Sequence, residues 1–247
     1  MAQQEIINLL SEMVKIPSIS SDKDHRDDVD ASAQFVEGLF ADLGLNTQVI
    51  KVPGGMPAVV AHTEIDPDKK TVLLYAHHDV QPVGDISLWN TDPFQPEMID
   101  GRLFGRGSGD NKSGVVVHYN VIKQLIDELP VNIKVFIEGE EEIGSPTMAL
   151  FIEQNREALE ADVIIIADSG NVKIGVPTIT TTLRGLVDGI IEGIVEKIGF
   201  RSTTIRKFDK SLAIIPNFQF AENAVINISE TSNWLISWII TLQYDTT

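Results

Sequence analysis

Apolar, strand-like runs that end in acidic residues or a histidine restrict the fold of this chain more than any other feature. The endings are His77-His78-Asp79 after residues 71–76, Glu138-Gly-Glu-Glu141-Glu142 after residues 131–137, and Asp168 after residues 163–167. In an open α/β sheet, binding crevices form at the carboxyl ends of the strands. One imidazole and several carboxylates gathered there would form an oxygen-rich site suited to divalent metal ions.

Helical and strand patterns alternate along the chain, as in α/β proteins. Apolar residues at helical spacing, or in a long buried run, predict helices over residues 6–14, 29–43 and 113–129. Strands are expected at residues 47–52, 58–62, 71–76, 131–137 and 162–167, the last two buried, with β-rich segments at 178–183 and 186–191. We therefore predict a three-layer αβα sandwich around a mixed, mostly parallel sheet.

Composition excludes several classes of partner. The formal net charge of −17 argues against nucleic acid and anionic membrane surfaces. With no cysteine, any metal must be held by histidine and carboxylates. The longest apolar stretch, residues 234–242, resembles a helical apolar face and is too short for a membrane span. The N-terminus lacks the basic region of a signal peptide, so we expect a cytoplasmic protein.

His77 and Asp79 lie two residues apart on an extended backbone, so their side chains face the same side. Such a pair can hold a metal through the imidazole, with the carboxylate fixing the ring's other nitrogen. A chance His-x-Asp pair is common, so this pair alone is weak support. His78 would face the other way and is expected to be structural.

Asp110 lies in a loop with four glycines, which allow unusual backbone angles and close approach to a ligand. A turn aspartate is the alternative, and the spacing around Lys112 does not fit a phosphate-binding loop. Glu141 and Glu142 are adjacent, so one can bind metal while the other faces substrate, although an acidic surface turn would look similar. Asp168 follows an isoleucine run and has few structural uses for its charge unless it is paired or metal-bound.

Four sequence blocks resemble one enzyme family in the family's own order. The blocks are residues 75–82 (Tyr-Ala-His-His-Asp-Val-Gln-Pro), 89–94, 100–108 and 138–146. They are similar to the dinuclear zinc aminoacyl-hydrolases of peptidase family M20, and most of all to their carnosinase-like dipeptidase branch. The resemblance covers about residues 1–192, the N-terminal catalytic half of the family, so we expect a fold that is incomplete at its C-terminal end.

The resemblance implies two zinc ions, with Mn²⁺ or Co²⁺ as possible substitutes, and a role for each acid. The implied ligands are His77, Asp110 and Asp168 for one ion, and Asp110, Glu142 and a later histidine for the other. Asp79 would orient His77, and Glu141 would be the general base that deprotonates a zinc-bound water. The resemblance also implies a cis peptide bond after Asp110. All five histidines lie at or before His118, so the second site lacks its histidine.

Charge divides the chain near residue 192. Residues 193–247 contain five basic and five acidic residues, so the whole net charge of −17 falls on residues 1–192. We predict that residues 1–192 form the N-terminal part of a metallopeptidase catalytic domain. Residues 193–247 would form a divergent tail of unclear structure that replaces the lid and the rest of that domain. A frameshifted or rearranged reading frame is the preferred explanation, and a divergent lid segment is the alternative.

The predicted function is metal-dependent hydrolysis of the amide bond in dipeptides or N-acyl amino acids, impaired by truncation. The alternative is a non-catalytic metal-binding remnant of such an enzyme. A small peptide or N-acyl amino acid is the expected partner, and we expect no nucleic acid, no membrane and no lid-mediated dimer. Without metal, the converging carboxylates should repel one another, and this repulsion should raise their pKa values.

Overall fold

The structure is a computed structural model that describes residues 3–182, 185–217, 225–228 and 235–244. The chain divides into two compact units, Met1–Gly170 and Asn171–Thr247. The border expected from charge, residue 192, lies inside a strand of the second unit, β8 (Gly185–Ile198). That residues 193–247 form a divergent tail stays a prediction.

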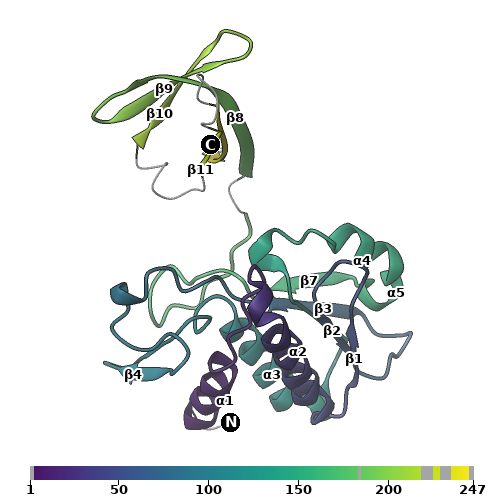
Figure 1. Ribbon diagram of the computed structural model, residues 1–247. Coiled ribbons are helices and arrows are strands. Elements are labelled where there is room, and N and C mark those ends of the chain that lie inside the picture. The colour runs from purple at the N-terminus through teal and green to yellow at the C-terminus, as the bar shows by residue number, and fades with distance from the viewer. Residues whose placement is uncertain (1–2, 183–184, 218–224, 229–234, 245–247) are drawn as a thin grey trace. The chain divides into compact units, whose positions relative to one another are not determined.

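The first unit is built on a five-stranded sheet with the order β1-β2-β6-β3-β7 (Figure 1). Its strands are β1 (Asn46–Ile50), β2 (Ala58–His62), β3 (Thr71–His77), β6 (Asn132–Glu138) and β7 (Val163–Ile166). Strand β3 pairs in parallel with β6 and β7, whereas β2 pairs antiparallel with β1 and β6. The predicted mixed sheet is confirmed. The sheet is also mostly parallel, as expected: β1, β6, β3 and β7 run in one direction, and β2 runs against them.

Helices cover both faces of this sheet (Figure 1). They are α1 (Gln3–Val14), α2 (Arg26–Ala41) and α3 (Lys112–Leu125) on one face, and α4 (Met148–Gln154) and α5 (Arg156–Leu159) on the other. The alternation of β3 serves both layers: Leu74 and Ala76 pack in the core under α2 and α3, and Leu73 packs in the core under α4 and α5. The predicted three-layer sandwich is confirmed.

Short elements complete the first unit. They are the 3₁₀ turns Lys23–His25, Ile86–Leu88, Ile126–Glu128 and Glu141–Ile143, and the hairpin of β4 (Glu97–Ile99) and β5 (Arg102–Phe104). None of the helices in the described part of the chain has the length and apolar character needed to cross a membrane.

Strand β7 is exposed, which corrects the expectation of a buried strand at residues 162–167. Its four apolar side chains are between 48% and 60% exposed. In the described sheet β7 is an edge strand whose only partner is β3. An unbroken apolar run predicts a strand covered on both sides, and this run instead forms the border of the sheet.

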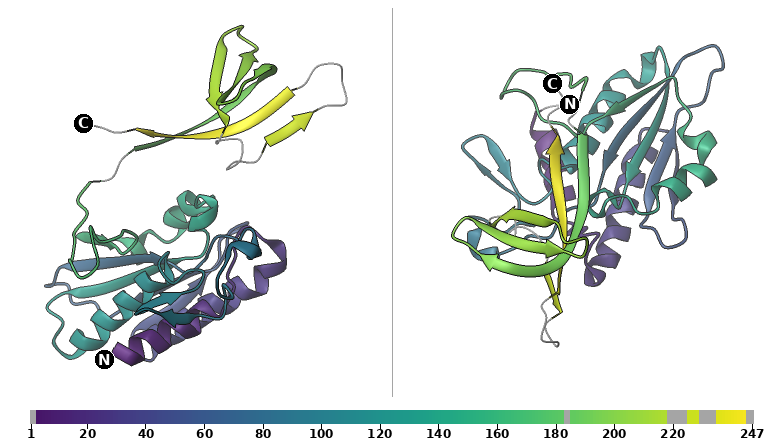
Figure 2. Two further views of the ribbon diagram at one scale, coloured as in Figure 1. Left: turned by 90° about the vertical axis from the view of Figure 1, so that its left-hand side faces the viewer. Right: turned by 90° about the horizontal axis from the view of Figure 1, so that it is seen from above.

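The second unit is an antiparallel sheet with the order β10-β9-β8-β12-β11 (Figure 2). Besides β8, its strands are β9 (Ser202–Lys207), β10 (Leu212–Pro216), β11 (Val225–Ile228) and β12 (Leu235–Tyr244). The predicted helical face at residues 234–242 is therefore wrong for 235–242, which pair with β8, while Trp234 lies outside the described residues. β-Branched and aromatic residues dominate this segment, and they favour strands. Of the two β-rich segments, 186–191 lies in β8, whereas 178–182 is not a strand and Leu183 lies outside the described residues.

The start of α3 approaches the end of β7 too closely for any side chain at Gly114. A Cβ atom there would lie 1.9 Å from Asn111 Oδ1 and 2.4 Å from the Ala167 carbonyl oxygen. At Gly38, in the last turn of α2, a Cβ atom would meet nothing within 4 Å. A side chain is therefore excluded at Gly114 but not at Gly38. Substituting each glycine in turn gives a matched test of the packing around the Asp110 loop.

We predict that Gly114→Ala lowers the free energy of unfolding by about 1–3 kcal/mol, because the added methyl group forces the backbone apart. Gly38→Ala should raise it by up to about 1 kcal/mol, since alanine is the better helix former. Urea unfolding followed by far-UV circular dichroism checks both. Equal effects of the two substitutions would contradict the close approach of α3 to β7.

Candidate metal centre

The structure brings His77, Asp110 and Asp168 together at the carboxyl end of β3. His77 is the last residue of β3 and is fully buried. Its Nε2 atom lies 3.1 Å from Asp110 Oδ1 and 3.8 Å from Asp168 Oδ1. One ligand atom from each of the three residues lies within 4.8 Å of the others. Because β7 runs parallel beside β3, the ends of the two strands meet and their following residues converge.

Asp79 links the His77 imidazole to the turn that follows β6, Glu141–Ile143, called the acidic turn below. Its carboxylate is fully buried and lies 3.3 Å from His77 Nδ1. The same carboxylate accepts the backbone N–H of Glu141 at 3.3 Å and that of Glu142 at 3.1 Å. Burial opposes the charge of Asp79, but interactions with the His77 and Ser20 side chains and the charges of His78 and His77 together outweigh it and hold the pKa of Asp79 below its usual range. This direction is opposite to the rise that we expected for Asp79.

Glu141 and Glu142 occupy different places around the centre. Glu141 Oε2 lies 3.7 Å from His77 Nε2. Burial raises the pKa of Glu141 to about 7, with the charge of His77 opposing and that of Asp168 adding to the rise. Glu142 stands outside the three-residue group and accepts hydrogen bonds from the Gln81 amide at its carboxylate (2.9 Å) and its carbonyl (2.8 Å). Burial also raises the pKa of Glu142, so the expected direction is confirmed for both glutamates, with burial and not mutual repulsion as the main cause.

The electrostatics of the centre favour a positive charge at the imidazole. Burial alone would lower the pKa of His77, but Asp79, Asp168 and Glu141 together raise it to about 9. A divalent cation can supply the same positive charge to these carboxylates, and one nitrogen with several oxygens is a donor set that zinc, manganese and cobalt accept. The Asp110 side chain is 72% exposed and that of Asp168 28% exposed, so the centre is open to solvent on one side. The residues present therefore fit a metal ion.

Lys112 holds the end of the loop that carries Asp110. The Asp110–Asn111 peptide bond is cis, as the family resemblance implies. Lys112, the first residue of α3, is fully buried and donates to the carbonyl oxygens of Met13 (2.8 Å) and Ile16 (2.5 Å). Burial lowers the pKa of Lys112 to about 7. The amino group thus ties the start of α3 to the end of α1.

Sequence reasoning missed Gln81 and Lys112. The period-two spacing that joins His77 to Asp79 extends to Gln81, so the same pattern could have placed the Gln81 side chain on the side of His77 and Asp79. Lysine is rarely fully buried, and no signal in the sequence marks Lys112. His78 was expected to be structural, and its Nε2 contacts the Pro57 carbonyl at 3.0 Å, away from the three-residue group.

Comparisons with known proteins agree with this geometry. The sequence model of peptidase family M20/M25/M40 matches residues 73–239. A cysteinylglycine-S-conjugate dipeptidase of Corynebacterium striatum is 34% identical over 186 residues, which are 74% of this chain and 41% of that protein. The chain thus spans less than half the length of this relative. The family match runs past residue 192, where we expected the resemblance to stop.

Solved structures give the same result. Human carnosine dipeptidase 1 superposes with a TM-score of 0.67 and 32% identity, over 77% of this chain and 43% of that one. An M20 family metallo-carboxypeptidase of Sulfolobus solfataricus superposes with a TM-score of 0.69 and 33% identity, over 82% of this chain and 45% of that one. The family match covers more than half of the sequence and includes the strand ends that form the metal centre. This chain belongs to peptidase family M20/M25/M40.

Proposed function

We propose that this chain is the metal-binding part of a hydrolase that cleaves the amide bond of dipeptides or N-acyl amino acids. The observation that carries the proposal is the three-ligand group of His77, Asp110 and Asp168 with Glu141 beside it. The names of the relatives, a cysteinylglycine-S-conjugate dipeptidase and a carnosine dipeptidase, support a dipeptide as substrate. Substrate and activity are proposals because the chain spans less than half of these proteins.

The proposed metal is zinc, with Mn²⁺ or Co²⁺ as substitutes. One ion would be held by His77, Asp110 and Asp168. Three protein ligands are the usual number for a catalytic zinc with an open position. Asp110 and Glu142 would hold a second ion more weakly, because they supply two ligands whereas the first ion has three. When bound, zinc supplies Lewis-acid polarisation of the scissile carbonyl and lowers the pKa of water.

Glu141 is the proposed general base. A group with a pKa of about 7 can take a proton from water and return it to the leaving amine at neutral pH, and its side chain borders the three-ligand group. Such proton transfer contributes roughly 10²–10⁴-fold to the rate. Asp79 is the proposed orienting group, because its carboxylate contacts His77 Nδ1 and the backbone N–H groups of both glutamates.

A metal-binding protein without catalysis is the second candidate. It is favoured by the position of Glu142, which stands outside the three-ligand group and hydrogen-bonds to Gln81. A cytoplasmic location stays a prediction. A measurement of dipeptide hydrolysis separates the two candidates.

We predict that Glu141→Gln abolishes dipeptide hydrolysis by the zinc-loaded chain and leaves zinc bound, since the amide cannot accept the proton. Glu153 is an exposed residue of α4, and the same substitution there, Glu153→Gln, should leave the rate of hydrolysis unchanged. Steady-state kinetics and zinc content per chain provide the two readouts. Full activity in Glu141→Gln would refute the assignment of the base.

We also predict that zinc stabilises the first unit and that a chelator reverses the effect. An ion that binds only the folded state adds about 2.7 kcal/mol when its free concentration is a hundred times the dissociation constant. Thermal unfolding with zinc and with chelator measures the difference, and His77→Gln should remove most of it. An identical melting temperature under both conditions would show that the three residues do not form a metal site.

A further inference from the structure

Glu140 is a buried acid that none of the roles above uses. It directly precedes Glu141 and Glu142, and only 4% of its surface is exposed. One carboxylate oxygen, Oε1, accepts the Thr147 N–H at 2.7 Å and the Thr147 hydroxyl at 2.6 Å. The other, Oε2, accepts the Met56 N–H at 3.0 Å. Both oxygens are therefore occupied by neutral donors from two separate segments.

These bonds join the loop before β2 to the segment before α4. The joint is tight, because a Cβ atom at Gly55 would lie 2.5 Å from Thr147 Oγ1 and 3.4 Å from Glu140 Oε2. The absence of a side chain at Gly55 lets Thr147 and Glu140 meet at this point. The two loops and the carboxylate thus form one packed support behind the acidic turn.

The backbone of Glu140 closes the turn itself. Its carbonyl oxygen accepts the N–H of Ile143 at 3.3 Å and that of Ser145 at 3.0 Å. These bonds close the 3₁₀ turn Glu141–Ile143, which carries the proposed base and one proposed metal ligand. Asp79 holds the start of this turn through two N–H groups, and Glu140 holds the segments that flank it. The turn is therefore fixed from both sides.

We propose that Glu140 is a positioning residue that keeps Glu141 and Glu142 directed at the metal centre, an inference that rests on the proposed function. When Glu140 is lost, the turn keeps only its hydrogen bonds to Asp79, so the side chains of Glu141 and Glu142 gain freedom to shift. The side-chain hydrogen bonds of Glu140 go to Met56 and Thr147, neither of which belongs to the three-ligand group. The loss of Glu140 therefore acts on the geometry of the base more than on the binding of substrate.

Glu140→Gln tests this role. The amide keeps the shape of the side chain but turns an NH₂ group toward one of the donors. We expect kcat to fall about 10–100-fold, the usual cost of losing a group that orients the ligands of a metal, with KM nearly unchanged. Hydrogen exchange of the backbone amides in residues 141–143 should become roughly tenfold faster as the turn opens.

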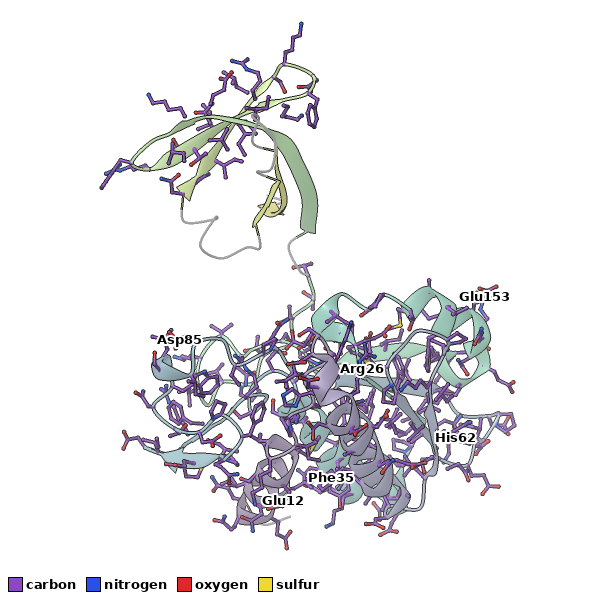
Figure 3. The ribbon with its side chains drawn as sticks, viewed as in Figure 1. Glu12, Arg26, Phe35, His62, Asp85 and Glu153 are labelled. Carbon is purple, nitrogen blue, oxygen red and sulfur yellow. The ribbon has the colours of Figure 1, made fainter. Side chains whose placement is uncertain are left out.

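Two further variants make the test decisive. Thr147→Val removes one of the three donors without changing the shape of the side chain, and it should give the same changes to a smaller extent even if Glu140→Gln does not fold. Glu153→Gln is the control, since Glu153 lies at the surface on α4 (Figure 3). It should leave kcat, KM and exchange at residues 141–143 as they are in the unsubstituted chain.

The outcomes separate the two proposals. If the unsubstituted chain hydrolyses dipeptides and Glu140→Gln and Thr147→Val match it in kcat and in exchange, Glu140 is not a positioning residue and the proposed function stands. If the unsubstituted chain shows no hydrolysis, the proposed function fails, and exchange at residues 141–143 still decides whether Glu140 holds the turn. A rise in KM at constant kcat would also overturn the inference.

Discussion

The arrangement of the centre depends on one buried carboxylate, that of Asp79. A charge removed from water is costly unless it is paired and hydrogen-bonded, and Asp79 meets this need with the His77 imidazole and two backbone N–H groups. The same contacts that satisfy the charge set the direction of the imidazole and the position of the acidic turn. Neither His77 nor the turn can move without leaving Asp79 partly unpaired. Stability and site geometry are therefore coupled through this residue.

The order and direction of the strands determine which residues lie near Asp79. Strand β3 lies between β6 and β7 and runs parallel to both, so three carboxyl ends lie side by side. His77 follows from one end, the acidic turn from the second and Asp168 from the third. The loop with Asp110 arrives from a different direction and is tied down by Lys112 and by the close fit at Gly114. The strand ends alone therefore do not complete the ligand group, and the contacts of Lys112 and Gly114 are needed to place Asp110.

Much of this could be predicted from the sequence because it depends on local patterns. Alternation and helical spacing predicted α1, α2, α3 and the five strands of the main sheet, and the ends of the strands predicted where His77 and Asp168 would meet. Contacts between distant segments left no such signal. The buried Lys112 and the support that Glu140 gives to the loop before β2 both join residues far apart in the chain. Segments whose state depends on pairing were misjudged: the apolar run of β7 became an exposed edge, and residues 235–242 became a strand through pairing with β8.

The central claim is that His77, Asp110 and Asp168 form one divalent-metal site in this chain. Anomalous diffraction at the zinc absorption edge, from crystals of the chain grown with zinc, tests it most directly. The account predicts a strong anomalous peak within bonding distance of His77 Nε2 and of a carboxylate oxygen from each aspartate. A peak bound only by other residues, or none at this position with zinc in excess, would contradict it.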